Sequence, residues 1–333
     1  MAEKKEKQVG NAGRRMRWMA AGILAAGIAY SAGWYWLANR VEAETARYIA
    51  TQRQQGTTIG CADRSVGGYP FRLEVFCTAF DLARPLDGLT VKAGAFRSAA
   101  QVYEPRRVYT ELDSPVVVES AVAGALRLDW SLARATASLA QPLPERASVA
   151  VDDLDVTLDG IGKALAAAHA EAHMRLREGD LDIAWRYEGL VFDERVAGRA
   201  NLPVLAGDGD VTIEDGAARA ASGLRTLRGA SGEIRRLALL VTPKQGLLVS
   251  GPFSVDEGGL VDATLELVVV DPAGLAQAFR AAFPELAAQI DALAAMSAES
   301  GPDGTPEIVL PVSIRDGQAV LGFIPLGRLP ALM

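Results

Sequence analysis

Alternating apolar and polar residues dominate the chain after its first 56 residues. The clearest rows, apolar at every second position, cover 71–77, 126–132, 181–187, 261–269 and 308–314. A period of two places one set of side chains on a buried face and the other in water, as in antiparallel sheets. Pairs typical of tight turns separate such rows, namely Asp215-Gly216, Gly258-Gly259 and Asp316-Gly317, the last inside a predicted hairpin over 312–323.

Two stretches between the strands have a helical pattern. The alanine-rich segment 161–178 predicts a helix, and 272–297 repeats apolar residues at helical spacing. Pro284 is expected to kink or split the second helix, because proline removes a backbone donor and clashes with the preceding turn. Both helices are expected to lie against the sheet.

The order of these elements predicts a mainly β (α+β) fold. Strands, a helix, more strands, a second helix and a hairpin suit a large curved antiparallel sheet over 57–330 with two interrupting helices. The two strand-then-helix passages suggest related halves, 57–178 and 179–330, although no repeat of individual residues supports them. Crossover helices are too few for a doubly wound parallel sheet.

The N-terminal segment has the pattern of a membrane anchor. Residues 18–38 contain no charge, and as a helix they would be about 31 Å long, close to the thickness of the bilayer core. Trp18 lies at one end, and Trp34, Tyr35 and Trp36 lie at the other, as expected of rings at membrane interfaces. The sequence therefore predicts a transmembrane helix over 18–38, continued by a helical stalk over 39–56 that ends at Gly56.

The charges around this segment predict its orientation. Residues 1–17 carry six basic and two acidic side chains, a net charge of +4, which leaves −11 of the total of −7 for the rest of the chain. Basic flanks stay in the cytoplasm, so we expect a cytoplasmic tail, a single pass through the inner membrane and a periplasmic main domain. The acidic main domain argues against nucleic acid as a partner.

Two other readings of the N-terminal segment compete with an anchor. A cleaved signal peptide would use a small-x-small site, for which Ala29-Tyr30-Ser31 is a weak match. A buried helix of a soluble protein would not need aromatic residues at both ends or a basic flank. The aromatic cluster after residue 33 suits a retained anchor better than a mature N-terminus.

The chain has two cysteines, Cys61 and Cys77. In an oxidising compartment they would form a disulfide, which closes a loop of about 17 residues and stabilises the fold by roughly 3 kcal/mol. Two buried free thiols or a redox pair are the alternatives. The absence of a C-x-x-C motif disfavours redox activity, and two thiols alone disfavour a metal site.

The segment around the second cysteine resembles a known family. Gly68-Tyr69-Pro70-Phe71-Arg72, followed by Leu-Glu-Val-Phe-Cys77, is similar to the alphaproteobacterial domain of unknown function 2125, and so is the C-terminal stretch 310–330. The resemblance implies a single-span envelope protein but no activity. A more distant architectural similarity is to AsmA-like envelope proteins, which are linked to lipid transport.

The same motif can be interpreted without the family. Proline at position 70 favours an extended Tyr69, and the glycines before it supply a turn. Phe71 is expected to open an inward-facing row that Cys77 closes, while Arg72 and Glu74 share the outer face. We therefore expect a strand entry pinned by the disulfide, with a binding role as the alternative.

Few residues suggest chemistry. His169 and His173 are four apart on the predicted helix, where both could face one metal ion, but Glu171 would lie off that face and no third ligand is visible. The acidic run that contains Asp152, Asp153, Asp155 and Asp159 lacks calcium-loop spacing and suits the wet face of a strand, with a bulge between Val151 and Leu154. Catalytic and nucleotide motifs are absent. We therefore predict no catalytic, cofactor-binding or metal site, and no enzyme activity.

The apolar faces of the predicted sheet suggest a function. If helices cover them incompletely, a concave groove remains that suits an acyl chain. We therefore expect a membrane-anchored periplasmic protein that binds or helps to transport lipid or another apolar envelope molecule. A non-catalytic scaffold of an envelope protein complex, with a filled core, is the alternative. A hydrolase is a third reading and would need a polar cleft with clustered carboxylates of shifted pKa.

Overall fold

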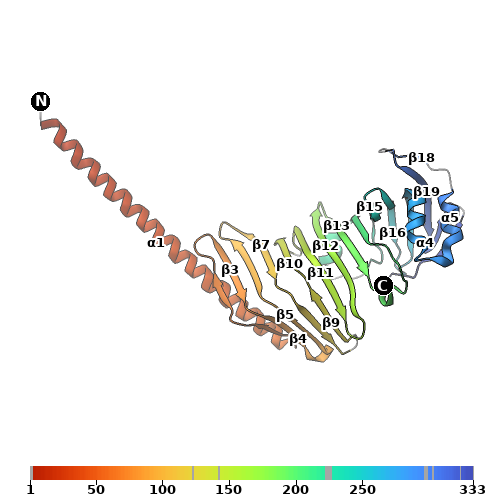
Figure 1. Cartoon of the computed structure of the whole chain (residues 1–333). Helices are drawn as coiled ribbons and strands as arrows, with labels where there is room; N and C mark the ends of the chain where they lie inside the picture. The colour runs from red at the N-terminus through yellow and green to blue at the C-terminus, as the bar shows by residue number, and fades with distance from the viewer. Residues whose placement is uncertain are drawn as a thin grey trace.

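The structure is a computed structural model that describes residues 3–121, 124–141, 143–221, 227–295, 299–301, 304–322 and 324–332. A long helix leads into a curved antiparallel sheet, and short helices lie near the far end of that sheet (Figure 1). The predicted mainly β fold with a large antiparallel sheet is confirmed. The division of 57–330 into two halves stays a prediction.

The strands fall into a first group of short segments and a second group of long ones. The first group is β1 (Thr58–Cys61), β2 (Ser65–Gly67), β3 (Arg72–Cys77), β4 (Phe80–Arg84), β5 (Leu89–Ala93), β6 (Phe96–Gln101), β7 (Glu104–Leu112), β8 (Val116–Ser120), β9 (Gly124–Asp129) and β10 (Leu132–Ser138). The second group is β11 (Arg146–Leu158), β12 (Gly162–Arg177), β13 (Asp180–Phe192), β14 (Leu205–Ile213), β15 (Ser231–Thr242), β16 (Gln245–Val255) and β17 (Val261–Val270). The two-residue β18 (Glu299–Ser300), then β19 (Pro306–Arg315), β20 (Gln318–Leu321) and β21 (Ile324–Arg328) complete the sheet.

The helices of the described chain are far fewer. They are α1 (Glu3–Gln54), α2 (Glu194–Ala197), α3 (Gly216–Ala221), α4 (Pro272–Arg280) and α5 (Ala287–Ala294), with single 3₁₀ turns at Pro85–Asp87 and Pro284–Leu286. Pro284 divides the segment predicted as one helix, as expected, and the predicted end at Ser297 lies outside the described residues. Asp215-Gly216 opens α3 instead of forming a tight turn between strands.

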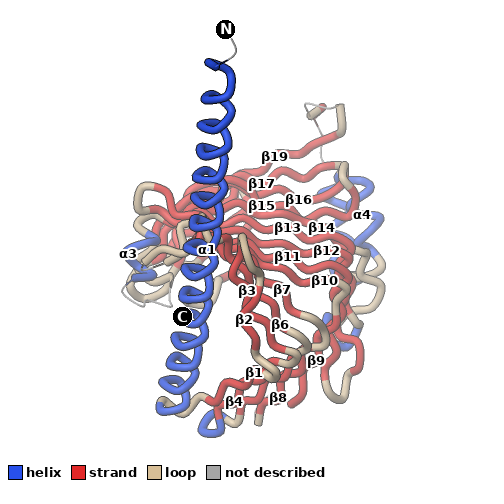
Figure 2. The backbone as a smooth tube through the Cα atoms, turned by 90° about the vertical axis from the view of Figure 1, so that its left-hand side faces the viewer, coloured by secondary structure: helices blue, strands red, loops and turns tan. Residues whose placement is uncertain are grey.

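Two rows of strands meet at β11. One row runs β2-β3-β6-β7-β10-β11 and continues through β12 to β17, then β19, β20 and β21. The other row runs β1-β4-β5-β8-β9 and joins the later part of β11, where Val156 lies opposite Leu128. The short strands therefore form two branches of one sheet, and Figure 2 shows both beside α1.

The largest correction concerns 161–178, which is strand β12 and not a helix. Its neighbours β11 and β13 hydrogen-bond to it along almost its whole length, from Leu165 to Arg175 on both sides. Alanine favours helices in isolation, but hydrogen bonds to the neighbouring strands β11 and β13 outweigh this weak preference. The alternation His169-Ala-Glu171-Ala-His173 is the strand signal within the alanine-rich stretch.

Two other strand predictions need smaller corrections. The row 126–132 is two strands, because the chain turns at Trp130-Ser131 between β9 and β10. The predicted bulge between Val151 and Leu154 shows only as a positive φ of 53° at Asp153, and the register shift comes later, between Val156 and Thr157. The hairpin of β19 and β20 is as predicted, although its last predicted residue, Phe323, lies outside the described residues.

Helix α1 includes the predicted anchor and stalk, and it ends just before Gly56, as predicted. Residues 13–30 are exposed, whereas a stripe that includes Trp34, Ala38 and Val41 packs on the domain. The segment predicted to span the membrane is helical, but within the described residues no helix is both long and apolar enough to cross one.

Two clusters of buried hydrophobic side chains lie at opposite ends of the sheet. Trp34 and Ala38 of α1 pack with Leu73 of β3 at the first end. Leu275 of α4 packs with Val269 and Ile308 at the second end, over β17 and β19. The long stretch of sheet between these two clusters therefore decides whether the protein has a filled core or an open face.

Candidate functional site

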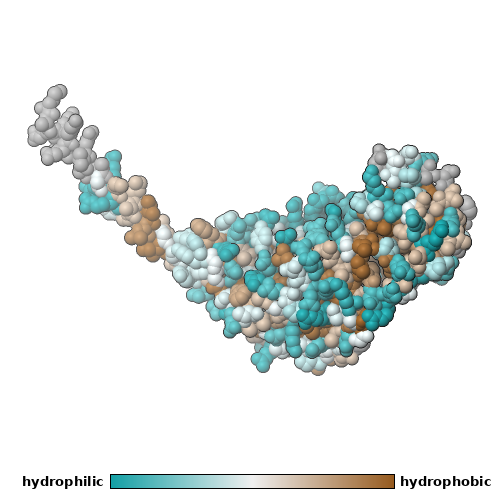
Figure 3. Space-filling view, in the orientation of Figure 1, coloured by the Kyte–Doolittle hydropathy of each residue, from teal (hydrophilic) through white to brown (hydrophobic). Residues whose placement is uncertain are grey.

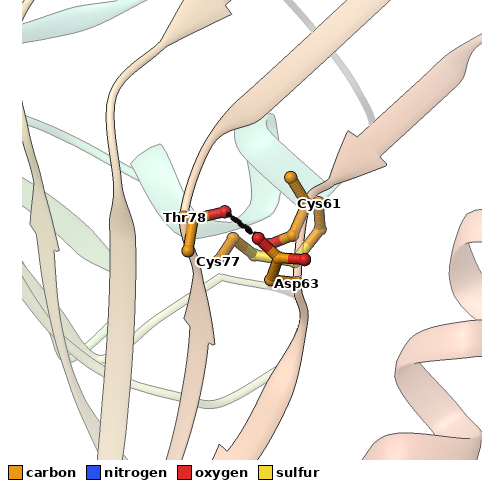
Figure 4. Close-up of a disulfide and its surroundings, with 5 residues drawn as sticks. Cys61, Asp63, Cys77 and Thr78 are labelled. Carbon is orange, nitrogen blue, oxygen red and sulfur yellow. Dashed lines mark hydrogen bonds between the residues drawn. A yellow bond between two sulfur atoms is a disulfide. The ribbon is translucent and has the colours of Figure 1, made fainter.

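The predicted disulfide is present and joins the two branches of the sheet. Cys61 ends β1 and Cys77 ends β3, with their Cα atoms 5.1 Å apart (Figure 4). Next to the bond, the Thr78 hydroxyl donates a 2.9 Å hydrogen bond to Asp63. Since β1 and β3 belong to different rows, the bond holds the branches together at the edge opposite their junction on β11.

The motif Gly68–Arg72 forms the turn between β2 and β3, beside α1. Gly68 has a φ of 97°, a conformation that favours glycine. Phe71 is wrong as the start of the inward row, because it precedes the strand and is 69% exposed; the inward row begins at Leu73. The Arg72 side chain pairs with Glu74 at 3.4 Å on the outer face, as predicted. The position of this turn against α1 bears on the membrane proposals below.

The two histidines lie in a ladder of polar side chains on one face of β11 and β12. His169 Nδ1 lies 2.5 Å from Asp152, and Glu171 lies between the two imidazoles, 3.6 Å from His169 Nε2 and 3.5 Å from His173 Nε2. The prediction that Glu171 points away was wrong, because residues two apart share a face in a strand. The hydrogen bond that His169 donates to the Asp152 carboxylate raises the pKa of His169, with a smaller contribution from Glu171.

The side chains of this ladder bond mainly to one another. Across the described ranges, no group of three or more His, Cys, Asp or Glu side chains is arranged to hold a metal ion. Neighbours in the ladder bond to one another, and His173 Nδ1 lies 2.9 Å from the Ser148 hydroxyl. We interpret the ladder as a solvated face of the sheet.

A charged cluster on the same face surrounds Asp182 of β13. The Asp182 side chain is 8% exposed and accepts hydrogen bonds from Arg175 at 2.9 Å, Thr212 at 2.8 Å and Arg235 at 3.2 Å. Burial by itself raises the pKa of Asp182, but the three donors outweigh it and lower the pKa to about 2. The cluster therefore holds a permanent carboxylate between arginines that join β12, β13 and β15.

The opposite face of the same strands is apolar. Residues directly opposite in register share a face of the sheet. The register therefore aligns one continuous apolar set across seven strands, defined here as the apolar face: Ala133, Ala135, Ala137, Ala147, Val149, Val151, Ala170, Ala172, Met174, Ile183, Trp185, Tyr187, Gly207, Gly209, Leu237, Leu239, Leu247 and Val249. This set runs from β10 to β16 without a charged side chain.

The apolar face is hollowed at its C-terminal end. A hollow of about 310 Å³ is lined mainly by Trp185 and Tyr187 of β13 and by leucines and valine of the next strands, Leu237, Leu239, Leu247, Val249 and Leu267. Figure 3 shows hydrophobic residues gathered in this region, beside the C-terminal helices. Burial raises the pKa of Tyr187 in its wall. The hollow is therefore a mainly apolar depression whose lining also includes the Tyr187 hydroxyl and Asp208.

Two glycines give the hollow its floor. A β-carbon at Gly209 would lie 2.2 Å from the Trp185 ring, and one at Gly207 would lie 2.5 Å from the Tyr187 hydroxyl. Both rings therefore lie flat across β14, which is possible only where the strand has no side chain. The sequence signal is the Gly207-Asp-Gly209 alternation within β14.

Helices contact the strands of the apolar face mainly at β13 and β16 within the described chain. Among the described elements, α1 packs on β1 and β2, α3 touches β13 at its first residues, and α4 packs on β16 and β19. Val149, in the middle of the face, is 44% exposed. The other side chains of the apolar face are half-buried, so this surface is partly accessible in the described chain.

Sequence reasoning found part of this site. The row 181–187 was predicted as a strand with Trp185 and Tyr187 on one face. The contributions of β15 and β16 were missed, although Leu237, Leu239, Leu247 and Val249 alternate in the same way. The Asp182 cluster was also missed, because its partners come from three strands up to 53 residues apart.

Comparison with known proteins identifies the family. Residues 34–330 match the family described as "Uncharacterized protein conserved in bacteria (DUF2125)", so the chain belongs to this family. No curated protein matches the chain. The distant similarity to AsmA-like proteins is not shown by these comparisons, and the family description assigns no activity.

Proposed function

We propose that this DUF2125 protein binds the acyl chain of a lipid, or another long apolar molecule, along the apolar face, while helix α1 holds it at a membrane. The observation that supports this proposal is the open apolar surface between the two helix-covered ends of the sheet. Apolar patches of this extent on a folded protein commonly mark binding sites. The proposal includes no catalysis.

The dimensions of the apolar face suit an extended chain. Neighbouring strands lie about 4.8 Å apart, so the six gaps from β10 to β16 cover roughly 29 Å. Alanines form the floor near β10 to β12, and larger side chains surround the hollow near β15. Each methylene group that leaves water contributes about 0.8 kcal/mol, so ten would contribute about 8 kcal/mol before the costs of association.

The tether is the second half of the proposal. Exposed apolar side chains follow the basic tail on α1, including Trp18 at 74%, Ile23 at 70% and Leu24 at 67%. Such a stretch beside a basic segment favours insertion from the cytoplasmic side of the inner membrane, which leaves the sheet in the periplasm. A disulfide between Cys61 and Cys77 agrees with an oxidising compartment.

A crosslinking experiment tests the binding site. Cells that express the full chain are fed a diazirine-labelled fatty acid, which they incorporate into lipids, and are then irradiated. Crosslinked peptides are mapped by mass spectrometry. We expect adducts on β13, β15 and β16 as well as on α1, since the proposed groove and the tether would both contact acyl chains.

Two variants of adjacent residues sharpen this test. Val249 points into the hollow, whereas Ser250 points to the other face of β16. Val249→Arg is expected to abolish the adducts on the sheet, and Ser250→Arg to leave them unchanged. Adducts on α1 serve as the internal standard in both variants. Adducts confined to α1 in the wild-type protein would exclude the proposed groove.

The scaffold alternative has one observation in its favour. Strand β21 pairs with β20 along one edge, and its side chains are exposed, with Ile324 at 52% and Leu326 at 58%. An edge strand of this kind can add a strand from a partner. In cells treated instead with a bifunctional amine-reactive crosslinker, a link to a second protein that Leu326→Glu removes, without lipid adducts on the sheet, would favour the scaffold.

A further inference from the structure

The turn that contains the family motif lies where α1 meets the sheet, together with a second turn. The Tyr30 hydroxyl donates a 2.6 Å hydrogen bond to the carbonyl of Pro70, and the Tyr69 hydroxyl lies 2.8 Å from that of Ser31. The Val102 amide donates to the Phe71 carbonyl at 3.0 Å, which brings the β6–β7 turn alongside. These are the parts of the sheet that contact α1 nearest to its bare apolar stretch.

Large aromatic side chains are exposed around this junction. Their exposed fractions are 50% for Tyr69, 59% for Tyr35, 62% for Trp36, 69% for Phe71 and 75% for Tyr103. The Tyr35 and Tyr69 rings stack with their centroids 6.0 Å apart, so helix and turn form one surface. We call these five residues the aromatic collar.

The exposed part of α1 is too short to span a bilayer by itself, which suggests a role for the aromatic collar. Only residues 18–29 of the uncharged segment are free of the domain, and as a helix they measure about 18 Å. The hydrocarbon core of a bilayer is about 30 Å thick. A helix inserted up to Arg17 would therefore begin to meet the domain about 12 Å before the opposite boundary, and it would place Tyr35 and Trp36, roughly 27 Å and 29 Å along the helix, close to that boundary.

The chemistry of the collar suits the boundary between acyl chains and headgroups. Tyrosine and tryptophan rings prefer this layer, because they combine an apolar body with a polar group. The charges at its rim are mainly basic. The Arg40 guanidinium lies 5.6 Å from the Trp36 ring, and Arg72, paired with Glu74, follows Phe71. Guanidinium groups at this position can reach lipid phosphates.

We propose that the aromatic collar is immersed in the outer interface of the membrane and seats the first end of the sheet directly on the bilayer. This inference rests on the membrane tether of the proposed function, but not on the apolar groove. It assigns the exposed residues of the Gly68–Arg72 motif to lipid contact. It also places the end of the sheet that contains β2 and β3 at the membrane surface.

Environment-sensitive labels test the collar in the full chain. Single cysteines at Phe71→Cys and Tyr103→Cys, with the native disulfide kept, are labelled with the fluorophore NBD and reconstituted into vesicles of phosphatidylcholine and phosphatidylglycerol. Leu86→Cys is the matched control, because Leu86 is 93% exposed and lies beside Gly56, at the opposite end of the docked part of α1. We expect blue-shifted emission and quenching by nitroxide-labelled lipids at positions 71 and 103. At position 86 we expect water-like emission without quenching.

Three results would overturn the inference, each in a different way. Water-like emission at positions 71 and 103 in protein that floats with the vesicles would exclude the collar but keep the tether. Failure to float would exclude the tether and the collar together. Equal quenching at position 86 would show that neither end of the docked helix contacts the membrane in preference to the other. None of these results depends on lipid bound to the apolar face.

Discussion

At the scale of single residues, Asp182 is a buried carboxylate whose neighbours lower its pKa. Its carboxylate lies between Arg175, Arg235 and the Thr212 hydroxyl. Because the folded pKa of Asp182 is lowered from 3.8 to about 2, the fold favours the charged form. The resulting stabilisation is complete above about pH 4 and is lost as the pH falls through about 2.

Replacement of Asp182 by a neutral isostere tests this account. Asp182→Asn is expected to lower the free energy of unfolding by about 2 kcal/mol at pH 7, measured by urea denaturation in detergent. The difference from wild type should shrink between pH 4 and pH 2. Glu188→Gln on the same strand removes an exposed pair with Arg186 and should cost less than about 0.5 kcal/mol. A difference at Asp182 that does not change with pH would contradict the assignment.

The sequence predicts some contacts between individual side chains but not others. Two cysteines allow only one intramolecular pairing, so the partners Cys61 and Cys77 follow directly from the sequence. The cluster around Asp182, by contrast, includes Arg235. A register shift between β14 and β15 after Asp210 brings Arg235 close to the Asp182 carboxylate. Such a shift depends on the geometry of two strands in contact, and no single stretch of sequence records it.

At the scale of elements, β12 shows where pattern and propensity disagree. Its alanines favour a helix in isolation, but helix propensity amounts to only tenths of a kcal/mol per residue. From His169 to Arg177 polar and apolar residues alternate strictly, which is the strand period. The alternation was the better guide, because the free edges of β11 and β13 supply hydrogen bonds on both sides. Helix α4 and the strands 181–187, 261–269 and 308–314 were predictable because their periods were unmixed.

The docking of α1 depends on one side chain. Trp34 is 5% exposed, packs on Leu73, and donates a 3.0 Å hydrogen bond to the Arg72 carbonyl. Trp34→Ala should destabilise the docked helix by about 3 kcal/mol, because it leaves a cavity and an unpaired carbonyl. Faster tryptic cleavage within residues 40–53 would report the release. Trp36→Ala, two residues along and 62% exposed, is the control in detergent, where the proposed membrane contact is absent, and should leave cleavage at Arg47 and Arg53 unchanged.

At the scale of the whole molecule, the apolar face is a product of register. Each strand contributes two or three apolar residues, and none of these rows by itself distinguishes a filled core from an open surface. The sequence therefore predicts alternating strands but not what covers them. Coverage is decided by the helices, and their positions at the two ends follow from long-range packing of Trp34 and Leu275.

The disulfide gives a prediction at this largest scale. The two branches of the sheet are continuous through β11, and at their other edge the bond from Cys61 to Cys77 adds a side-chain link to the backbone crossings from β1 to β2 and from β3 to β4. The Cys61→Ser, Cys77→Ser double variant should lose roughly 3 kcal/mol by the loop-entropy account. Hydrogen exchange should rise in β1 and β4, which pair at this edge, and stay unchanged in β15 and β16. A uniform rise across all strands would instead mean that the two branches and the long strands unfold as one cooperative unit, and that the bond stabilises the whole sheet equally.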